Sequence, residues 1–465
     1  MRSATLTAAF AAWVAGAGLL FVAGCGGGVG SGGTGLAIGT INGFGSIIID
    51  GSRFDDSAVA TVREDAPGIE TQTQALLGQR AEVKIDDLGN ASAVTVNPTL
   101  VGPAVVAAPG TFTVLGQPVV INADSTLGPV TQFAGGYTDA TSVLSGDPIE
   151  VHGVVVVQGT ASTVRATRVE RLAALPAYLK ATGIVSGSTA GAFAINALAV
   201  DARSASVVPA GASLVDGTVV SLLAPTSTLA IGATGGPTVV AAQIRVGSLD
   251  ADASRITLSG SVSALDTTAQ SFTVDGVRVL YAGATISPNG ATLAGRYVVV
   301  VGHRLADGSL QAASVTVRDG TDAPGAELHG NITAFVSNSS FQVRGVNVDA
   351  STAAITGCPA SGLADGLYVE LEGSLTPTGV RATELHCDGE PAGATVERGG
   401  VAGSVDTVAQ TFVVSNSTGT PVPVSWTTTT LFQNVSPATL AGKRVEIEGQ
   451  FNGNVLVARQ IELDN

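Results

Sequence analysis

Four histidines are the side chains of this chain best suited to acid–base or metal chemistry. They are spread through the sequence at His152, His303, His329 and His386. None belongs to a His-Glu-x-x-His pattern, which would bring two zinc ligands and a general base onto one helix face. We therefore expect isolated structural or surface histidines, and we predict no metal site, no cofactor and no catalytic residue.

Acidic residues close to glycine suggest a second kind of site, for calcium. Asp55-Asp56 and Asp86-Asp87-Leu-Gly-Asn90 offer the oxygen ligands that calcium prefers. The regular Asp-x-Asp-x-Asp-Gly loop is absent, however, and Asp or Asn beside Gly is typical of hairpin tips that hold no ion. Turns are therefore the first interpretation of both segments, and calcium binding is the alternative.

Hydrolase chemistry has little support in the sequence. The Gly-x-Ser-x-Gly motif of an esterase nucleophile does not occur. Paired carboxylates for glycoside hydrolysis would meet only in space, but a sugar site also favours aromatic platforms, and Trp426 is the only tryptophan after the first 24 residues. We therefore expect a protein that is not an enzyme.

The net charge argues against a nucleic-acid partner. The chain has 37 acidic and 22 basic residues and a formal charge of −15, which repels a phosphate backbone. The basic residues are scattered, so no polybasic stripe is present for anionic lipid. Attachment to a membrane must come from another feature.

The first 24 residues are predicted to be a lipoprotein signal peptide. Arg2 precedes an apolar run over residues 8–21, and Val22-Ala23-Gly24-Cys25 ends it with small residues before a cysteine. This pattern resembles the bacterial lipobox, and the resemblance implies cleavage, lipidation of Cys25 and, because glycine follows the cysteine, sorting to the outer membrane of a Gram-negative host. Residues 25–35 then form a Gly-rich tether. The alternative is an uncleaved transmembrane anchor, since residues 6–24 are close to the roughly 20 that span a bilayer.

Cys358 and Cys387 are the only cysteines besides Cys25. Export to an oxidising compartment predicts a disulfide between them. Two unpaired thiols remain the alternative, because the sequence does not show whether their Cα atoms approach within roughly 7 Å.

Three sequence anchors recur six times and organise the rest of the chain. The first is a Phe-x-Val strand, with Ile replacing Phe in the first copy, and it begins at Ile47, Phe112, Phe193, Phe272, Phe341 and Phe412. The second is a leucine, a glycine and an alternating strand, which begins at Leu76, Leu144, Leu214, Leu293, Leu363 and Leu440. The third is a closing Ala-x-x-Val/Ile/Leu strand, which begins at Ala91, Ala166, Ala241, Ala312, Ala382 and Ala458. The interval of roughly 70 residues exceeds the roughly 20 to 50 of solenoid repeats, so each copy is predicted to be a small domain.

Each copy is predicted to be a five-stranded β-barrel. In the fourth copy the strands are expected at Thr257–Val262, Ser271–Val274, Val277–Tyr281, Tyr297–Val301 and Leu310–Val317. Asp275-Gly276 predicts a tight hairpin turn, and closure into a barrel would remove exposed strand edges. The fold class is therefore all-β, a tandem array of small five-stranded OB-like barrels. The predicted domains are residues 36–98, 99–173, 179–247, 254–318, 326–388 and 395–465.

The Phe-x-Val-x-Gly and Leu-x-Gly-x-x-Val-x-Val-x-Gly elements resemble a bacterial domain-of-unknown-function family, number 5666, from Gly35 to the C-terminus. The resemblance implies tandem copies in an exported, lipid-anchored protein, but no chemistry. The first interpretation is a non-catalytic, lipid-anchored cell-envelope protein that is a structural or binding array. The second is a lipoprotein that binds a small ligand or a protein through exposed barrel faces, and the third is an envelope enzyme. The expected partners are the membrane, through the lipid anchor, and an unidentified envelope protein.

Overall fold

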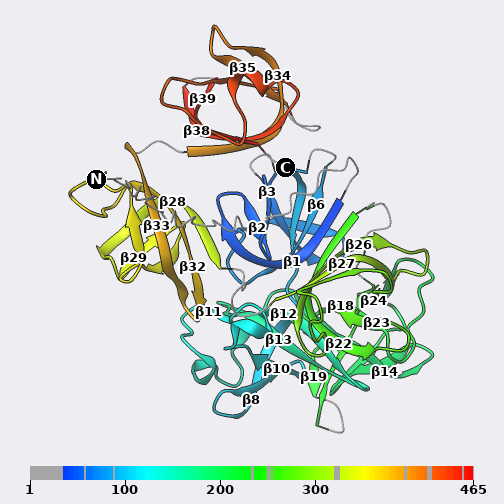
Figure 1. Cartoon of the computed structure of the whole chain (residues 1–465). Coiled ribbons are helices and arrows are strands. Elements are labelled where there is room, and N and C mark those ends of the chain that lie inside the picture. The colour runs from blue at the N-terminus through cyan, green and yellow to red at the C-terminus, as the bar shows by residue number, and fades with distance from the viewer. Residues whose placement is uncertain are drawn as a thin grey trace, which may run out of the picture.

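The computed structural model describes residues 35–56, 59–86, 89–231, 235–247, 249, 253, 255–318, 325–391, 395–415, 421–452 and 455–463. Nearly all regular structure in these residues is β-strand (Figure 1). The helices described are short 3-10 turns: η1 (Ser125–Leu127), η2 (Ala140–Ser142), η3 (Thr226–Thr228) and η4 (Pro437–Thr439). The predicted all-β class is confirmed.

The strands form six consecutive barrels. Barrel 1 comprises β1 (Gly35–Phe44), β2 (Ile47–Ile49), β3 (Ser52–Phe54), β4 (Thr61–Ala66), β5 (Ile69–Gln72), β6 (Arg80–Ile85) and β7 (Ala91–Val96). Barrel 2 comprises β8 (Leu100–Ala108), β9 (Thr111–Val114), β10 (Gln117–Ile121), β11 (Gln132–Ala134), β12 (Pro148–Gln158) and β13 (Ala161–Arg171). Barrel 3 comprises β14 (Tyr178–Thr189), β15 (Ala192–Ile195), β16 (Leu198–Asp201), β17 (Ser206–Val208), β18 (Val219–Pro225), β19 (Ala230–Ile231), β20 (Pro237–Val240) and β21 (Gln243–Val246).

The second half of the chain repeats the pattern more regularly. Barrel 4 comprises β22 (Arg255–Asp266), β23 (Ser271–Val274), β24 (Val277–Leu280), β25 (Thr285–Ser287), β26 (Tyr297–Arg304) and β27 (Leu310–Val317). Barrel 5 comprises β28 (Ala326–Ser337), β29 (Ser340–Val343), β30 (Val346–Asp349), β31 (Ala354–Thr356), β32 (Leu367–Thr376) and β33 (Gly379–Pro391). Barrel 6 comprises β34 (Thr395–Asp406), β35 (Thr411–Ser415), β36 (Val422–Ser425), β37 (Leu431–Gln433), β38 (Arg444–Asn452) and β39 (Val455–Leu463).

Barrel 4 shows how five strands close. Its strands pair in the order β22, β23, β24, β27, β26 and back to β22, and only the β24–β27 pair is parallel. Barrels 2, 5 and 6 close with the same order. The predicted five-stranded barrel is confirmed, and the short β25 is an additional strand beside β27 that the sequence did not predict.

The phenylalanine anchor lies in the barrel cores. Phe112, Phe193, Phe272, Phe341 and Phe412 are all at most 4% exposed, so their interpretation as core residues is confirmed. In barrels 1, 2, 4 and 5 the residues after the anchor form a tight hairpin turn with positive φ at both central positions, as at Asp275 (46°) and Gly276 (81°) in barrel 4. Such a turn matches the twist of the strands that it joins.

The last glycine of the second anchor is explained by a β-bulge. In four barrels the register of the fourth strand shifts immediately before this glycine, which is Gly153, Gly302, Gly373 or Gly449. A Cβ atom on any of these glycines would lie 2.1 to 2.4 Å from a carbonyl oxygen of the fifth strand. The bulge therefore brings two backbones closer than a side chain permits.

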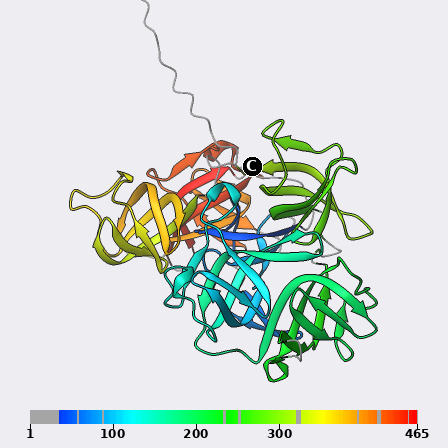
Figure 2. The ribbon, with the colours of Figure 1, turned by 90° about the horizontal axis from the view of Figure 1, so that it is seen from below.

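Strand β1 connects three barrels that are distant in sequence. Beyond its partners in barrel 1, it pairs in parallel with β22 of barrel 4 over Gly35–Ile38 and with β28 of barrel 5 at Gly43 and Phe44. Barrels 2 and 3 share a second sheet, because β8 pairs with β14 at Leu100 and Val101. The barrels are thus tandem in sequence but clustered in space, and β1 lies near the centre of both views (Figure 1 and Figure 2).

A disulfide joins Cys358 and Cys387 within barrel 5, as predicted. Their Cα atoms are 4.6 Å apart, which is inside the range that such a bond requires. Cys387 lies on β33 in the barrel core, whereas Cys358 follows β31 and is partly exposed. The bond therefore ties the loop after β31 to the closing strand.

We predict that Gly449→Ala destabilises barrel 6 by about 1–3 kcal/mol, because the new Cβ would lie 2.2 Å from the carbonyl oxygen of Val457. Gly403→Ala is the matched control, since the nearest atom to its Cβ is 3.9 Å away. Trp426 is buried in barrel 6 and is the only tryptophan after residue 24, so fluorescence during urea unfolding of a chain that lacks residues 1–24 reports on this barrel. Equal unfolding midpoints for the two variants would contradict the steric explanation.

We predict that reduction destabilises barrel 5 selectively. The disulfide spans 29 residues, for which the chain-entropy model gives about 3.5 kcal/mol. Hydrogen exchange followed by mass spectrometry should show faster exchange in barrel 5 peptides after reductant is added, with barrel 6 peptides as the internal control. Labelling of both cysteines in denatured protein that was never reduced would show that the bond is absent.

Candidate functional site

The four histidines have two different environments. His152 on β12 is 0% exposed and His329 on β28 is 4% exposed. His303 on β26 and His386 on β33 lie at the surface. Both buried rings contact carboxylates, so the expectation of isolated histidines is wrong for His152 and His329.

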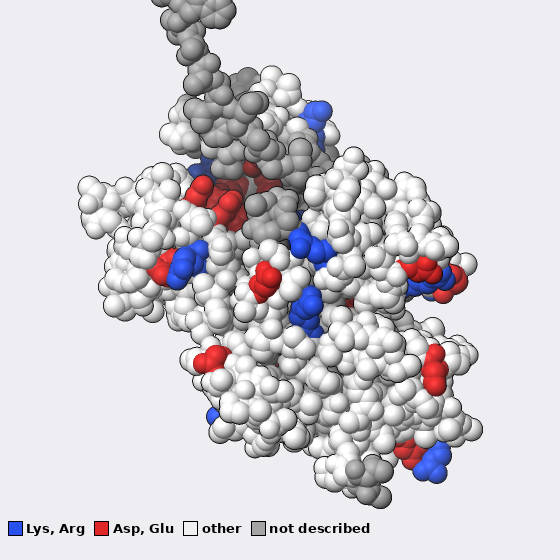
Figure 3. All heavy atoms as spheres, turned by 60° about the horizontal axis from the view of Figure 1, so that its bottom comes forward, with Lys and Arg blue, Asp and Glu red and all other residues white. Residues whose placement is uncertain are grey.

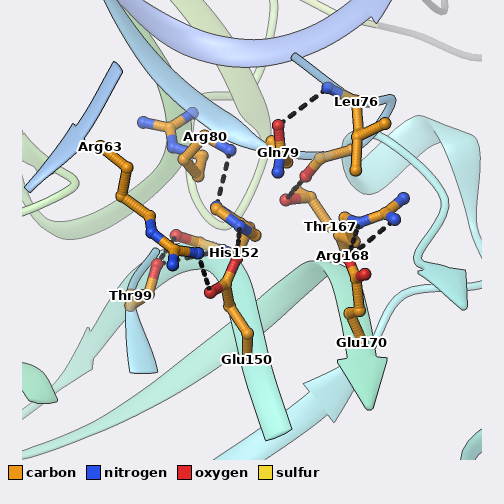
Figure 4. Close-up of polar contacts among 12 residues, drawn as sticks. Arg63, Leu76, Gln79, Arg80, Thr99, Glu150, His152, Thr167, Arg168 and Glu170 are labelled. Carbon is orange, nitrogen blue, oxygen red and sulfur yellow. Dashed lines mark hydrogen bonds and ion pairs between the residues drawn. The ribbon is translucent and has the colours of Figure 1, made fainter. Parts of the chain in front are cut away.

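The His152 site lies on the outer face of barrel 2, against barrel 1. Glu150 and His152 point to the same side of β12, since alternate residues of a strand share a face. Val151, between them, points inward to the core of barrel 2. The outward pair packs against the beginning of β6, where Arg80 lies (Figure 4).

Both ring nitrogens of His152 are hydrogen-bonded. Nε2 lies 2.8 Å from Glu150 Oε1 and donates its proton to it, while Nδ1 accepts the backbone N–H of Arg80 at 3.2 Å (Figure 4). Because Nδ1 must accept, the ring is neutral, and burial accordingly lowers the pKa of His152. Burial alone would raise the pKa of Glu150, but the hydrogen bond from His152 and the charge of Arg63, 2.9 Å away, hold that pKa below its usual range.

Arg80 extends this network to barrel 4. Its guanidinium donates to Asp275 Oδ2 at 2.7 Å and to the carbonyl oxygen of Ser259 at 3.1 Å, and Arg80 is only 3% exposed. Asp275 lies in the hairpin turn of barrel 4, and its Oδ1 accepts the backbone N–H of Val155 in barrel 2 at 3.2 Å. Three barrels therefore meet at the ion pair of the buried Arg80 with Asp275.

Asp50, in the first hairpin turn of barrel 1, makes a second contact with barrel 4. Its Oδ2 accepts the backbone N–H of Thr40 at 2.8 Å, the hydroxyl of Tyr297 at 2.9 Å and the hydroxyl of Ser259. Burial and the charge of Asp50 raise the pKa of Tyr297 above its ordinary value. The carboxylate is thus a fixed acceptor for side chains of barrel 4.

Barrel 3 joins the cluster through charged groups as well. Arg245 Nη2 lies 3.0 Å from Glu64 Oε2 of barrel 1. Lys180, on β14, is 9% exposed, and burial lowers its pKa to about 8. A lysine with such a pKa could act as a nucleophile, but it lies among the carboxylates of Glu64 and Glu150 inside the joint.

The geometry favours a structural role for this network. A histidine–glutamate pair can transfer protons only where a substrate can reach it, and the side chains of His152 and Glu150 are 0% and 5% exposed. A hollow of about 400 Å³ lies elsewhere in barrel 2 and is lined by Gly135, Pro148, Arg171, Leu172 and Ala173. The buried charges therefore favour one way of docking the barrels, a use that is attested for buried ion pairs in some other proteins.

A different arrangement surrounds His329. Its Nε2 lies 2.8 Å from Glu327 Oε1 and 3.2 Å from Glu370 Oε1. Potential ligand atoms of these three side chains lie within 4.8 Å of one another, and within the described part of the chain this is the one group whose His and Glu atoms converge in this way. Histidine nitrogen and carboxylate oxygen are both ligands of divalent transition metals.

The two acidic segments considered for calcium have structural contacts in the fold: Asp86 stabilises a turn, and Asp55 links two barrels. Asp86 Oδ1 accepts the backbone N–H of Asn90 at 2.9 Å, which is a turn contact. Asp55 Oδ2 accepts the backbone N–H of Gly399 at 2.9 Å and so links barrel 1 to barrel 6. Asp87 lies outside the described residues.

One sequence signal for both buried histidines was overlooked. His152, His329 and His386 each follow a glutamate by two residues, in a Glu-x-His pattern. On a strand this spacing places the two side chains on one face. The pattern differs from the His-Glu-x-x-His spacing of a helical metal site, in which the two ligands are four residues apart.

Other predictions concern the start of the chain. Cys25, the predicted signal peptide over residues 1–24 and the tether up to residue 34 lie outside the described residues. None of the helices in the described residues is long and apolar enough to cross a membrane.

We predict that acid weakens the joint between barrels 1 and 2. The pKa of His152 is lowered in the folded chain. The neutral ring therefore contributes its full stabilisation above the ordinary histidine pKa of about 6.5. Below that value the free energy of unfolding falls by at most about 1.4 kcal/mol per pH unit. Urea unfolding between about pH 8 and pH 5.5 should show a smaller pH dependence for His152→Gln than for the wild type. The exposed His303→Gln is the control; an unchanged slope in His152→Gln would contradict the assignment.

Four regions of the chain match the domain of unknown function DUF5666: residues 104–170, 259–316, 329–386 and 399–462. They fall in barrels 2, 4, 5 and 6, which are the four barrels that close in the same strand order and carry the bulge glycine. No curated protein matches the chain. The matched regions cover more than half of the sequence, and the predicted resemblance is confirmed: the chain belongs to the DUF5666 family.

Proposed function

We propose that this chain is a non-catalytic, lipid-anchored cell-envelope protein whose six barrels form one rigid scaffold. The observation that carries the proposal is the position of β1. This strand begins at Gly35, directly after the Gly-rich tether that follows Cys25, and it pairs with barrels 4 and 5. A lipid on Cys25 would therefore hold the strand around which the barrels assemble.

The buried charges support a scaffold and not an enzyme. The groups with shifted pKa values at the centre of the cluster, including Lys180 and His152, lie inside joints between barrels. Their hydrogen bonds run from barrel to barrel. Each group is thus occupied in fixing the relative position of two domains.

The surface supports the exclusion of nucleic acid. Figure 3 shows a face that is largely uncharged, with basic and acidic side chains in small separate spots. A nucleic-acid interface would instead gather lysine and arginine into one patch or groove. Together with the net charge of −15, this distribution favours partners of another kind.

Binding through barrel faces, the alternative function, has weaker support. Large apolar side chains that are exposed are found at Ile69, Val105, Val120, Leu144, Val215, Ile231, Val240, Val336, Val408 and Leu431. They occupy different positions in different barrels, so no equivalent apolar face recurs among the described residues. Single exposed apolar residues of this kind are normal on a protein surface.

We predict that Cys25 carries the lipid. Cells fed an alkyne-tagged fatty acid should label the wild type and the double variant Cys358→Ala/Cys387→Ala, but not Cys25→Ala. Two or three acyl chains make release from the membrane negligible, because each buried methylene contributes about 0.8 kcal/mol. Mass spectrometry that finds Met1 intact and an unmodified Cys25 in the native protein would overturn the proposal in favour of an uncleaved anchor.

A further inference from the structure

The outer face of barrel 5 carries an ordered array of titratable side chains. Strands β28, β32 and β33 lie side by side, and their register places glutamates or histidines directly across from one another. One row across the strands is Glu327, Glu372 and Glu384. The adjacent row is His329, Glu370 and His386. Six side chains that can bind a cation therefore share one face.

The register of the glutamate row is electrostatically unfavourable without a counter-charge. Side chains directly opposite on antiparallel strands have Cβ atoms about 4.5–5.5 Å apart, and like charges in that position are destabilising. The row of three glutamates places like charges opposite each other twice. A cation bound at Glu327 would reduce this repulsion.

The His329 ring is held in place at one end of its row. It is 4% exposed, and a Cβ atom on Gly45 of barrel 1 would lie 2.8 Å from its Cγ and Nδ1. The turn between β1 and β2 therefore covers the ring and leaves Nε2 directed at Glu327 and Glu370. A ligand that is fixed in this way loses little conformational freedom when a metal binds.

We propose that Glu327, His329 and Glu370 form a binding site for a divalent transition metal of the zinc class. A tetrahedral metal about 2.0–2.2 Å from each ligand atom requires ligand atoms roughly 3.4 Å apart. Nε2 lies 2.8 and 3.2 Å from the two carboxylate oxygens, so the carboxylates need to move only slightly outward to admit the metal. The imidazole favours such a metal over calcium or magnesium, which prefer oxygen ligands alone. The site goes beyond the scaffold function and does not depend on the lipid anchor.

Two neighbouring features affect access to the site and competition for its ligands. The side chain of Glu370 is 46% exposed, so solvent or a further ligand can reach the metal from that side. Arg53 of barrel 1 contacts Glu327 and lies 3.6 Å from Glu446 of barrel 6. A metal on Glu327 would compete with Arg53 for this carboxylate, so the site lies where barrels 1, 5 and 6 meet.

Zinc binding to the full chain, stripped of metal with a chelator, tests the proposal by calorimetry. We expect one saturable site, with affinity lowered at least tenfold in Glu370→Gln and in His329→Asn. Glu370→Gln changes a half-exposed residue, so it keeps the test decisive if His329→Asn fails to fold. Glu462→Gln is the control. Glu462 occupies the position in barrel 6 that His386 occupies in barrel 5, and His386 is not one of the three proposed ligands.

Cobalt provides a second readout. A visible absorption band should appear when cobalt is added to the wild type and to Glu462→Gln, and it should be lost or shifted in Glu370→Gln. No saturable binding up to millimolar zinc, or equal zinc affinity in the wild type and in Glu370→Gln, would overturn the assignment.

Discussion

The arrangement of the whole molecule depends on how strand β1 satisfies its backbone hydrogen bonds. Buried backbone groups must be paired, and most residues of β1 are buried. Its first half pairs with β6 and β22, and its last residues pair with β2 and β28. One strand thus belongs to barrel 1 and also pairs with a strand of barrel 4 and a strand of barrel 5. Separating those barrels would expose a row of unpaired N–H and C=O groups.

Buried charges add specificity to this framework. Removing two charges from water costs free energy that a good ion pair only partly recovers, so the pair of Arg80 and Asp275 is not a strong source of net stability. Loss of Asp275 alone, however, would leave Arg80 buried without a carboxylate, which is far more costly. The ion pair therefore favours the docking of barrels 1 and 4 in which its two partners meet.

The sequence predicted the barrels well and their assembly poorly. Local signals were sufficient for strands, because alternation, the anchor phenylalanines and the Asp275-Gly276 turn act over a few residues. The pairing of β1 with β22 joins residues that are far apart in the chain, and no local pattern specifies it. The carboxylate partners of His152 and His329 were not predicted for a different reason. Their Glu-x-His spacing has meaning on a strand, where residues two apart share a face, and none on a helix.

The two buried Glu-x-His units show that surroundings, not local sequence, decide what such a pair does. At His152 the second ring nitrogen accepts a backbone N–H, and Arg63 balances the charge of Glu150, so the pair is fully occupied within the joint. At His329 the strand alongside contributes a further carboxylate, Glu370, to the same ring nitrogen. A single proton on Nε2 cannot serve two carboxylates equally well, whereas a cation with several coordination positions can. The same three-residue segment is therefore a structural joint on β12 and a ligand set on β28.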